Sequence, residues 1–293
     1  MMRAVFAKLF IHVLSWLPLP VAQAIGTVIG ILAHLVPNSL QRPLRTNIDL
    51  CFPTMPPNQR SRLYRQSFIE LGHAITEIGA LWLWNDDRLM KQVKQVSGEK
   101  FLEQGFAKGK GVILALPHLG AWEIMGVYCS RKYPMTSLYR PLRLEALNPF
   151  IKQARERFGA TLVPTNARGI RALYKALSSN GLVAILPDQD PGREGSVFVP
   201  FCGIAASTMT LLPKLANRSG AAIIYGYAER LPKGAGYKIH FIPERSPMPA
   251  NDLIQSTTMI NQGVEKCMRQ IPAQYQWSYK RFKTRPEGEP RIY

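Results

Sequence analysis

The chain has 293 residues, of which 46% are hydrophobic and 19% are charged, and it contains 22 Gly and 23 Pro. This composition excludes wholesale disorder and collagen-like repeats, and the length allows one large domain or two modest ones. The 37 basic and 19 acidic residues give a net charge of +18, so we expect a polyanionic partner such as nucleic acid, an anionic membrane surface or an acidic protein.

The N-terminal region contains the longest uncharged stretch of the chain, residues 9–41. Pro18 and Pro20 divide it into two apolar pieces, each shorter than the ~20 residues that a helix needs to cross a bilayer. A cleaved signal peptide and a buried core hairpin are alternatives. We favour a kinked membrane anchor over residues 1–40, either spanning the bilayer or lying in its interface.

Basic residues are more numerous after this segment than before it. The following arginines are Arg42, Arg45, Arg60, Arg62 and Arg65. If the segment spans a membrane, this excess predicts that the rest of the chain, residues 41–293, lies on the cytoplasmic side.

Residues 41–293 read as one domain in which extended and helical patterns alternate. We expect strands at 111–116, 136–139, 161–163, 182–186, 197–199, 221–227 and 237–242. We expect helices at 58–83, 122–130, 144–158, 169–179, 208–219 and 253–269. This alternation predicts an α/β fold with a mainly parallel central sheet and helices on both faces. The basic, proline-containing tail, 279–293, is expected to wrap the surface.

A candidate catalytic pair follows the apolar run 111–116. Pro117 stops that run, and His118 follows at once, where ligands gather in open α/β sheets. Glu123 lies five residues further on, near the start of a helix, so its carboxylate could orient the imidazole and raise its basicity. Such a pair could remove a proton from an alcohol or amine. A structural histidine with an unrelated surface glutamate is the alternative.

Two carboxylates follow the next apolar run. Asp188 and Asp190 come directly after 182–186, and together they could bind Mg²⁺, pair with an arginine or cap a loop. We expect ion pairing or positioning rather than a metal site. The four cysteines form no C-x-x-C pair, which argues against a zinc ribbon.

Several motifs occur in a characteristic order along the chain. The segment 118–123 reads H-L-G-A-W-E, an H-x4-E motif, and it is followed by D-Q-D at 188–190, F-V-P-F-C-G at 198–203 and Q-Y-Q-W-S-Y-K-R-F-K at 274–283. This set resembles the bacterial lipid A late acyltransferases, the lauroyl/myristoyl transferase family of the glycerolipid acyltransferase superfamily. The chain departs from the family pattern at Cys202, where a second Phe is common, and at Tyr279, where His is common.

The resemblance implies a glycerolipid-acyltransferase-like fold and transfer of a fatty acyl group from acyl carrier protein to a hydroxyl of a lipid A precursor of the Kdo-lipid IVA type. It implies His118 as general base, Glu123 as its orienting partner, and Arg155 and Asp188 as further polar residues that bind substrate. It also implies a bacterial inner-membrane enzyme with its catalytic domain on the cytoplasmic side, with no cofactor beyond the acyl donor and no metal. The acidic carrier protein, the lipid precursor and the anionic membrane surface would then be its partners.

Other functions stay open from the residues themselves. The same catalytic pair could acylate a glycerophospholipid or another glycolipid. A non-enzymatic basic binder of membranes or nucleic acid is a further possibility, although no RNA-binding, zinc-finger or helix-turn-helix signature is evident and we expect no nucleic-acid partner. A metal-dependent hydrolase using His118, Glu123 and Asp188 is the remaining alternative. A covalent acyl-enzyme is less favoured, because no G-x-S-x-G motif occurs.

Overall fold

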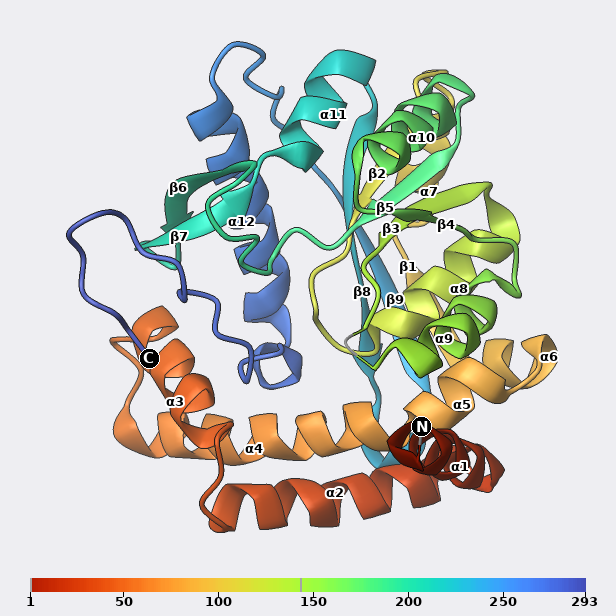
Figure 1. Ribbon diagram of the computed structural model, residues 1–293, viewed down its shortest axis with the longest axis vertical. Helices are drawn as coiled ribbons and strands as arrows, with labels where there is room; N and C mark the ends of the chain where they lie inside the picture. The colour runs from red at the N-terminus through yellow and green to blue at the C-terminus, as the bar shows by residue number, and fades with distance from the viewer. Residues whose placement is uncertain (1, 143) are drawn as a thin grey trace.

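The computed structural model describes residues 2–142 and 144–293, and a seven-stranded sheet forms its centre (Figure 1). The strand order is β1-β9-β8-β2-β5-β3-β4. The bounds are β1 Val93–Ser97, β2 Val112–Ala115, β3 Met135–Tyr139, β4 Thr161–Pro164, β5 Leu182–Ile185, β8 Ala222–Arg230 and β9 Tyr237–Pro243. Neighbouring strands are parallel except for the antiparallel pair β8 and β9. The predicted α/β fold with a mainly parallel sheet is confirmed.

Helices cover both faces of this sheet. Successive side chains of a strand point to opposite faces. Ile113 and Ala115 of β2 therefore join one core with α10 (Ala167–Ser178), α11 (Leu211–Ser219) and α12 (Leu253–Gln270). Val112 and Leu114 join a second core with α7 (Lys100–Phe106) and α8 (Trp122–Lys132). Burial on both faces explains why β2 is an unbroken apolar run rather than an alternating one.

Two strands lie outside the central sheet. β6 (Ser196–Phe201) and β7 (Ile204–Met209) pair antiparallel as a separate hairpin. The strand expected at 197–199 therefore exists but does not extend the main sheet, and β7 takes the start of the helix expected at 208–219. The sequence also gave no sign of the edge strand β1, because its residues are exposed or only half-buried and form no apolar run.

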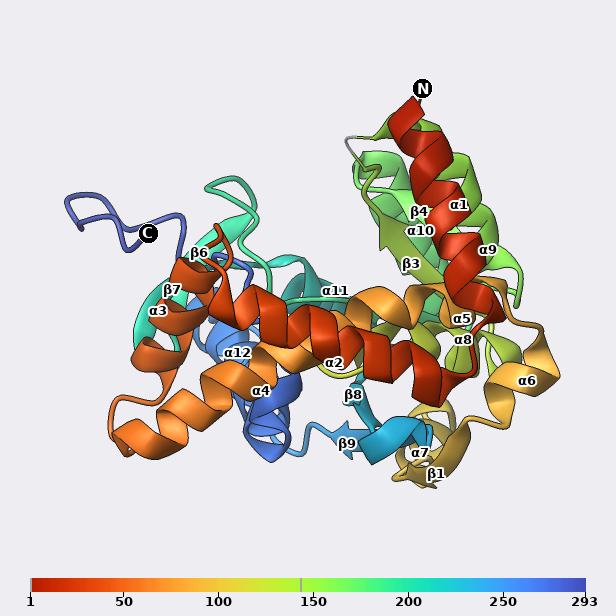
Figure 2. The same cartoon turned by 90° about the horizontal axis from the view of Figure 1, so that it is seen from below.

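The N-terminal region folds into helices that form one side of the molecule, seen from below in Figure 2. α2 (Leu19–Leu35) packs along α4 (Pro57–Thr76), and α1 (Met2–Trp16) packs on α5 (Ile78–Leu83). A Cβ atom on Gly72 would lie only 2.0 Å from the carbonyl oxygen of Gly26, so α2 and α4 can approach this closely only with glycine at that position. Within the described residues, no helix is both long enough and apolar enough to cross a membrane.

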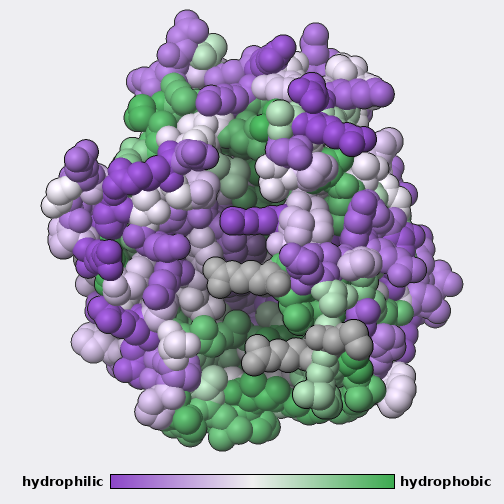
Figure 3. Space-filling model, viewed as in Figure 1, coloured by the Kyte–Doolittle hydropathy of each residue, from purple (hydrophilic) through white to green (hydrophobic). Residues whose placement is uncertain are grey.

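The outward faces of α1 and α2 are apolar. Exposed large hydrophobic residues on these helices and in the segment between α2 and α3 are Met2, Val5, Phe6, Leu9, Phe10, Val13, Trp16, Val21, Ile25, Val28, Leu32, Leu35, Val36 and Leu40. In the rest of the described chain, only Ile75, Leu142 and Ile254 are large hydrophobic residues with comparable exposure. Figure 3 shows hydrophobic side chains along the lower edge of the molecule, where Figure 1 places α2. We call this set the apolar underside.

The remaining helices connect these layers. They are α3 (Gln41–Cys51), α6 (Asp86–Met90), α9 (Asn148–Glu156) and the short 3-10 helices Glu145–Leu147, Pro232–Gly234 and Pro272–Gln274. The single helix expected at 58–83 is two helices, α4 and α5, which meet at Glu77. The tail expected to wrap the surface begins inside the protein instead, because Arg281 and Phe282 are buried.

Candidate active site

The sheet brings His118 and Asp188 together. β2 and β5 are neighbours with Ala115 opposite Ile185, so the Pro-His and Pro-Asp dipeptides that follow the two strands leave the same edge of the sheet. The Leu116 N–H donates to the Ile185 carbonyl at 2.8 Å and extends the pairing beyond the strand ends. The two site residues therefore meet because the carboxyl ends of neighbouring parallel strands coincide.

The Asp188 carboxylate holds His118 by two hydrogen bonds. One oxygen accepts from ring Nδ1 at 2.8 Å, and the other accepts from the His118 backbone N–H at 2.8 Å. A carboxylate at Nδ1 stabilises the tautomer with its proton on that nitrogen, which leaves a lone pair on Nε2. The imidazole is mostly buried, with 14% of its side chain exposed, and is positioned to act as a base through Nε2.

Asp188 remains ionised despite its burial. Burial alone would raise the pKa of this carboxyl, but the charge of His118 and the two hydrogen bonds from it lower the pKa below its usual value. Arg281 contributes in the same direction. A buried, charged acceptor at Nδ1 stabilises positive charge on the ring when Nε2 takes up a proton.

The second ring nitrogen faces a pair of glutamine amides. Nε2 of Gln189 lies 3.1 Å from Nε2 of His118 and also donates to Oε1 of Gln276 at 3.2 Å. The backbone N–H of Gln276 donates to the His118 carbonyl at 3.0 Å. The dipeptide Asp188-Gln189 thus reaches both nitrogens of one imidazole.

The turn after His118 requires glycine. Gly120 has a φ of +61°, and a Cβ atom there would lie 1.9 Å from the carbonyl oxygen of Ala228. Instead, the next residue, Ala121, donates its N–H to that carbonyl at 2.8 Å, and Gly120 donates to Gln274 at 3.0 Å. These two hydrogen bonds hold the turn that follows His118 between β8 and the C-terminal segment.

Glu123 and Arg155 form a separate pair beside the imidazole. The Arg155 Nε donates to Glu123 at 3.1 Å, and a terminal nitrogen of the same guanidinium contacts the other carboxylate oxygen. Burial acts to raise the pKa of Glu123, but Arg155 outweighs it and the pKa is lowered. Its position in the first turn of α8 also favours a negative charge.

The expected hydrogen bond between Glu123 and His118 is not among the contacts of the described residues. Asp188 and Gln189 occupy the two ring nitrogens, and Arg155 occupies the Glu123 carboxylate. The partner of His118 was expected on the helix that follows it in the sequence. In the structure the partner is Asp188, which follows the neighbouring strand β5. Arg155 was expected to bind substrate, and the structure pairs it with Glu123.

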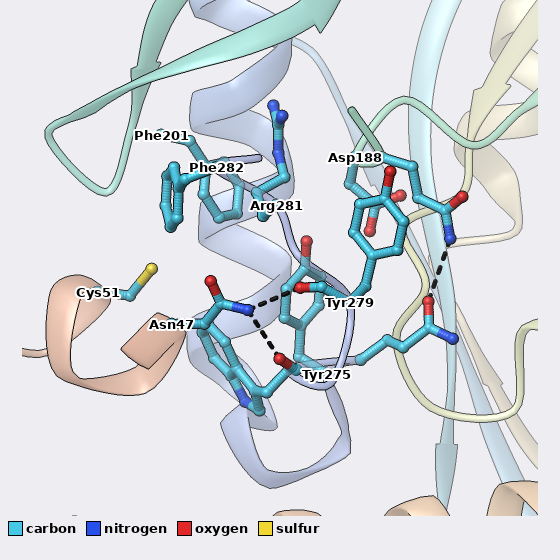
Figure 4. Close-up of a pocket in the computed structure, with 11 residues that line it drawn as sticks. Asn47, Cys51, Asp188, Phe201, Tyr275, Tyr279, Arg281 and Phe282 are labelled. Carbon is cyan, nitrogen blue, oxygen red and sulfur yellow. Dashed lines mark hydrogen bonds between the residues drawn. The ribbon is translucent and has the colours of Figure 1, made fainter. Parts of the chain in front are cut away.

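Two pockets adjoin the site and share the segment 275–277. The first, of ≈ 270 Å³, is shown in Figure 4 and is lined by Asn47, Cys51, Asp188, Gln189, Phe201, Tyr275, Gln276, Trp277, Tyr279, Arg281 and Phe282. The Arg281 guanidinium points away from Asp188 and donates to the carbonyl of Ser207 and the hydroxyl of Thr208 in β7 (Figure 4).

The second pocket, of ≈ 320 Å³, lies between α4, Trp122 and the C-terminal segment. Its walls are Leu44, Ser67, Glu70, Leu71, Ala74, Trp122, Arg230 and residues 274–278. The Trp122 ring packs edge-on against the His118 ring, with 5.4 Å between their centroids. His118 itself lines neither pocket, but its partners do: Asp188 and Gln189 line the first, and Trp122 lines the second.

Comparison with known proteins places this site in a family. A model of the family described as bacterial lipid A biosynthesis acyltransferase matches residues 3–284. The chain belongs to this family. A lipid A biosynthesis lauroyltransferase of Escherichia coli (strain K12) is 31% identical over 280 residues, covering 94% of this chain and 90% of the relative. A palmitoleoyltransferase of the same organism is 30% identical over 303 residues, covering 98% of both chains.

A third relative broadens the range of acyl groups. The lipid A biosynthesis myristoyltransferase of Escherichia coli (strain K12) is 25% identical over 280 residues, covering 94% of this chain and 83% of the relative. The resemblance that the motifs indicated is confirmed at the level of the acyltransferase family. The three relatives are named for different fatty acids, so membership of the family does not determine which acyl group this protein would transfer.

Sequence reasoning missed several residues of this candidate site. Gln189 lies in the D-Q-D motif and Gln276 lies in the segment 274–283. Apart from these positions, the sequence contained no signal that either residue belongs to the site. Asp190, considered with Asp188 as a possible metal ligand, instead accepts the backbone N–H groups of Gly192 and Thr284. The Tyr279 hydroxyl accepts from the Asp190 backbone N–H at 3.0 Å, so this departure from the family pattern helps hold the same loop.

Proposed function

We propose that this protein transfers a fatty acyl group from acyl carrier protein to a hydroxyl of a lipid A precursor, with His118 as the general base. The main support for this role is the hydrogen bond from Nδ1 of His118 to the buried Asp188 carboxylate, because it leaves Nε2 as a proton acceptor. Membership of the lipid A acyltransferase family supports the reaction class, and the names of the relatives support the acceptor.

The proposed transfer is direct and balanced. Nε2 of His118 takes the proton of the acceptor hydroxyl, and the oxygen attacks the carbonyl carbon of the thioester. The tetrahedral intermediate then collapses, the carbon–sulfur bond breaks, and the departing thiolate takes the proton back from the imidazolium. General-base assistance of this kind contributes about 10²–10⁴-fold in rate. Asp188 stabilises the imidazolium between the two proton transfers.

Glu123 and Arg155 support the reacting groups in this proposal. Glu123 engages Nε and one terminal nitrogen of Arg155, so the guanidinium is fixed while its other terminal nitrogen remains for substrate. A fixed guanidinium is well suited to stabilise negative charge on a thioester oxygen or a phosphate. Glu123 then acts through Arg155 rather than through the imidazole.

We propose that the enzyme works on the cytoplasmic side of the bacterial inner membrane. The apolar underside supports binding to lipid, because a gathering of exposed large hydrophobic side chains marks an interaction site. Arg42, Arg45, Arg62 and Arg65 are exposed on the adjoining helices α3 and α4, and each could add about 1 kcal/mol toward anionic lipid. The net charge of +18 also suits the acidic carrier protein.

The acceptor is the part of this proposal that a single assay tests. Purified protein is incubated with membranes and acyl carrier protein that carries a labelled acyl chain, and mass spectrometry identifies the labelled lipid. We expect the label in a lipid A precursor and no label with the variant His118→Asn. Label in glycerophospholipid would replace the acceptor but keep the reaction, and full transfer by His118→Asn would overturn the mechanism.

A further inference from the structure

The side chains of Gln189 and Gln276 form a hydrogen-bonded pair beside Nε2 of the imidazole. We infer that Gln189, held by Gln276, is a positioning residue that keeps His118 in the tautomer able to act as a base. This inference rests on the proposed general-base role of His118. It concerns the ring nitrogen opposite Asp188, where the acceptor hydroxyl has to bind.

The orientation of the Gln189 amide follows from donors and acceptors. Asp188 accepts from Nδ1, so in the neutral ring Nε2 can only accept. The group of Gln189 that faces it at 3.1 Å must therefore be the NH₂ group. The second hydrogen of that NH₂ group goes to Oε1 of Gln276 at 3.2 Å, so both donors are used and the amide has one satisfied orientation.

The Gln276 side of the pair is anchored independently. Its backbone N–H donates to the His118 carbonyl at 3.0 Å, and the residue before it, Tyr275, pairs with Leu119 through a β-bridge. The acceptor oxygen of Gln276 is thus fixed relative to the backbone of His118 itself. If the turn that contains His118 moves, Gln276 moves with it. The Gln189 amide, which we call the cap of the imidazole, therefore keeps its place relative to the ring.

Before the acceptor binds, the two amides oppose protonation of Nε2. When Nε2 carries a proton it becomes a donor, and an NH₂ group facing it would leave two donors opposed. Both amides must then turn over, so that Oε1 of Gln189 faces the ring and the NH₂ group of Gln276 faces Gln189. The acceptor hydroxyl, on binding at Nε2, displaces the Gln189 amide and meets a nitrogen already held as an acceptor.

Two isosteric substitutions place the same added charge either directly at Nε2 or one residue further away. Gln189→Glu places a carboxylate opposite Nε2, which can only accept, so the ring is held protonated and cannot act as a base. Gln276→Glu adds the same charge one residue further along the network, but it still accepts from the NH₂ group of Gln189 and preserves the cap. Gln276→Glu is therefore the matched control.

The charged and titratable groups around this imidazole are common to both variants. They are Asp188 after β5, Glu123 with its partner Arg155 from α8 and α9, and Arg281, Tyr275 and Tyr279 from the C-terminal segment. Because these groups are unchanged, a difference between the two variants reports the carboxylate placed directly at Nε2 and not the other groups around the ring.

The experiment measures the pH–rate profile of acyl transfer and the ¹⁵N NMR spectrum of the His118 ring in the intact protein. We expect the acid limb of Gln189→Glu to move up by about 1–2 pH units, which lowers kcat/KM about 10- to 100-fold at pH values below the limb. The rate of Gln276→Glu is free to change, since Gln276 belongs to the same network, but its acid limb should stay within about half a unit of the wild type. The ring spectrum should show imidazolium to higher pH in Gln189→Glu alone.

Two outcomes are decisive, and they differ from failure of the proposed function. Equal profiles and equal ring spectra for the two variants would overturn the positioning role of Gln189. Undiminished turnover by His118→Asn would overturn the general-base mechanism, whereas the NMR readout of the tautomer needs no turnover and tests the cap independently. Recovery of Gln189→Glu activity at high pH is the sign that the variant is folded.

Discussion

The Asp188 carboxylate accepts two hydrogen bonds from His118, one from the ring and one from the backbone, each 2.8 Å long. The two residues are 70 positions apart and meet because β2 and β5 are neighbours in register. The backbone contact fixes the carboxylate relative to the chain, and the ring contact then fixes the imidazole relative to the carboxylate. The orientation of the imidazole is therefore set by the sheet.

Replacing Asp188 tests this arrangement directly. We expect Asp188→Asn to lower kcat about 10²–10⁴-fold, because a neutral amide no longer fixes the tautomer or stabilises the imidazolium. Asp190→Asn is a matched control two residues away, since Asp190 contacts loop amides and not the ring. Acyl transfer with labelled donor gives the rates, and circular dichroism checks folding. Equal losses in the two variants would contradict the assigned role.

The ion pair of Glu123 and Arg155 predicts non-additive substitutions. Either Glu123→Ala or Arg155→Ala leaves one buried or half-buried charge without its partner, so each alone should lower kcat at least tenfold. The double variant should lose little more than the worse single one, because both remove the same unit. A complete double-mutant cycle of acyl transfer rates measures this coupling. Fully additive losses would mean that the two side chains act separately.

Acid should destabilise the fold through the same carboxylates. The pKa values of Asp188 and Glu123 are lowered in the folded protein, so their contribution is present above the ordinary carboxyl pKa and is lost as pH falls through the folded values. We expect the free energy of unfolding to fall with pH below about 5. Urea titrations at several pH values measure it. Asp188→Asn and Glu123→Gln should show a shallower fall, and an unchanged slope would contradict the pKa directions.

A buried ion pair below the site is structural. Arg230 contacts Glu77 at 2.6 Å, and the Tyr237 hydroxyl donates to the same carboxylate at 3.1 Å. Glu77→Gln should lower the free energy of unfolding by about 3 kcal/mol, because it removes the buried counter-ion of Arg230 and leaves only the longer contact with Glu70 at 3.5 Å. The exposed pair of Lys152 and Glu156 is the control, and Lys152→Gln should change stability by less than about 1 kcal/mol. Urea denaturation compares them, and similar effects would contradict the distinction.

Lipid binding should depend on the apolar underside. Val28 in α2 and Ile254 in α12 are 57% and 51% exposed, but only Val28 belongs to that surface. Val28→Glu should weaken flotation with vesicles of anionic phospholipid about tenfold, because a charge replaces a side chain that burial in lipid stabilises by about 1.5 kcal/mol or more. Ile254→Glu should float like the wild type. Equal flotation of both variants would remove this surface as the membrane contact.

The sequence predicted the central architecture because buried parallel strands leave unmistakable apolar runs. β2 and β5 were located almost to the residue, and His118 and Asp188, which lie at the same edge of the sheet, were named from their positions after these runs. What the residues could not provide was strand order. Without it, the neighbour of His118 was sought five positions along the chain at Glu123, although the structural neighbour comes from the adjacent strand.

Other differences have the same origin in long-range contacts. Nothing local marks Glu77 as a break between helices, because its burial depends on Arg230, which is 153 positions away. The tail was expected at the surface because it is basic, yet Arg281 is buried through bonds to Ser207 and Thr208 in a hairpin that was itself only half predicted. The amide pair of Gln189 and Gln276 is 87 positions apart and carries no spacing that a pattern could detect.

α4 has α2 on one side and the second pocket on the other. With the underside on lipid as proposed, two stacked helices separate the bilayer from that pocket, and each is about 10 Å across. The height of the reaction above the membrane is thus built into the protein as a spacer of about 20 Å. A lipid whose hydroxyl stands on a tall sugar headgroup can reach that level with its chains still in the bilayer, whereas a short-headed lipid would have to be lifted out.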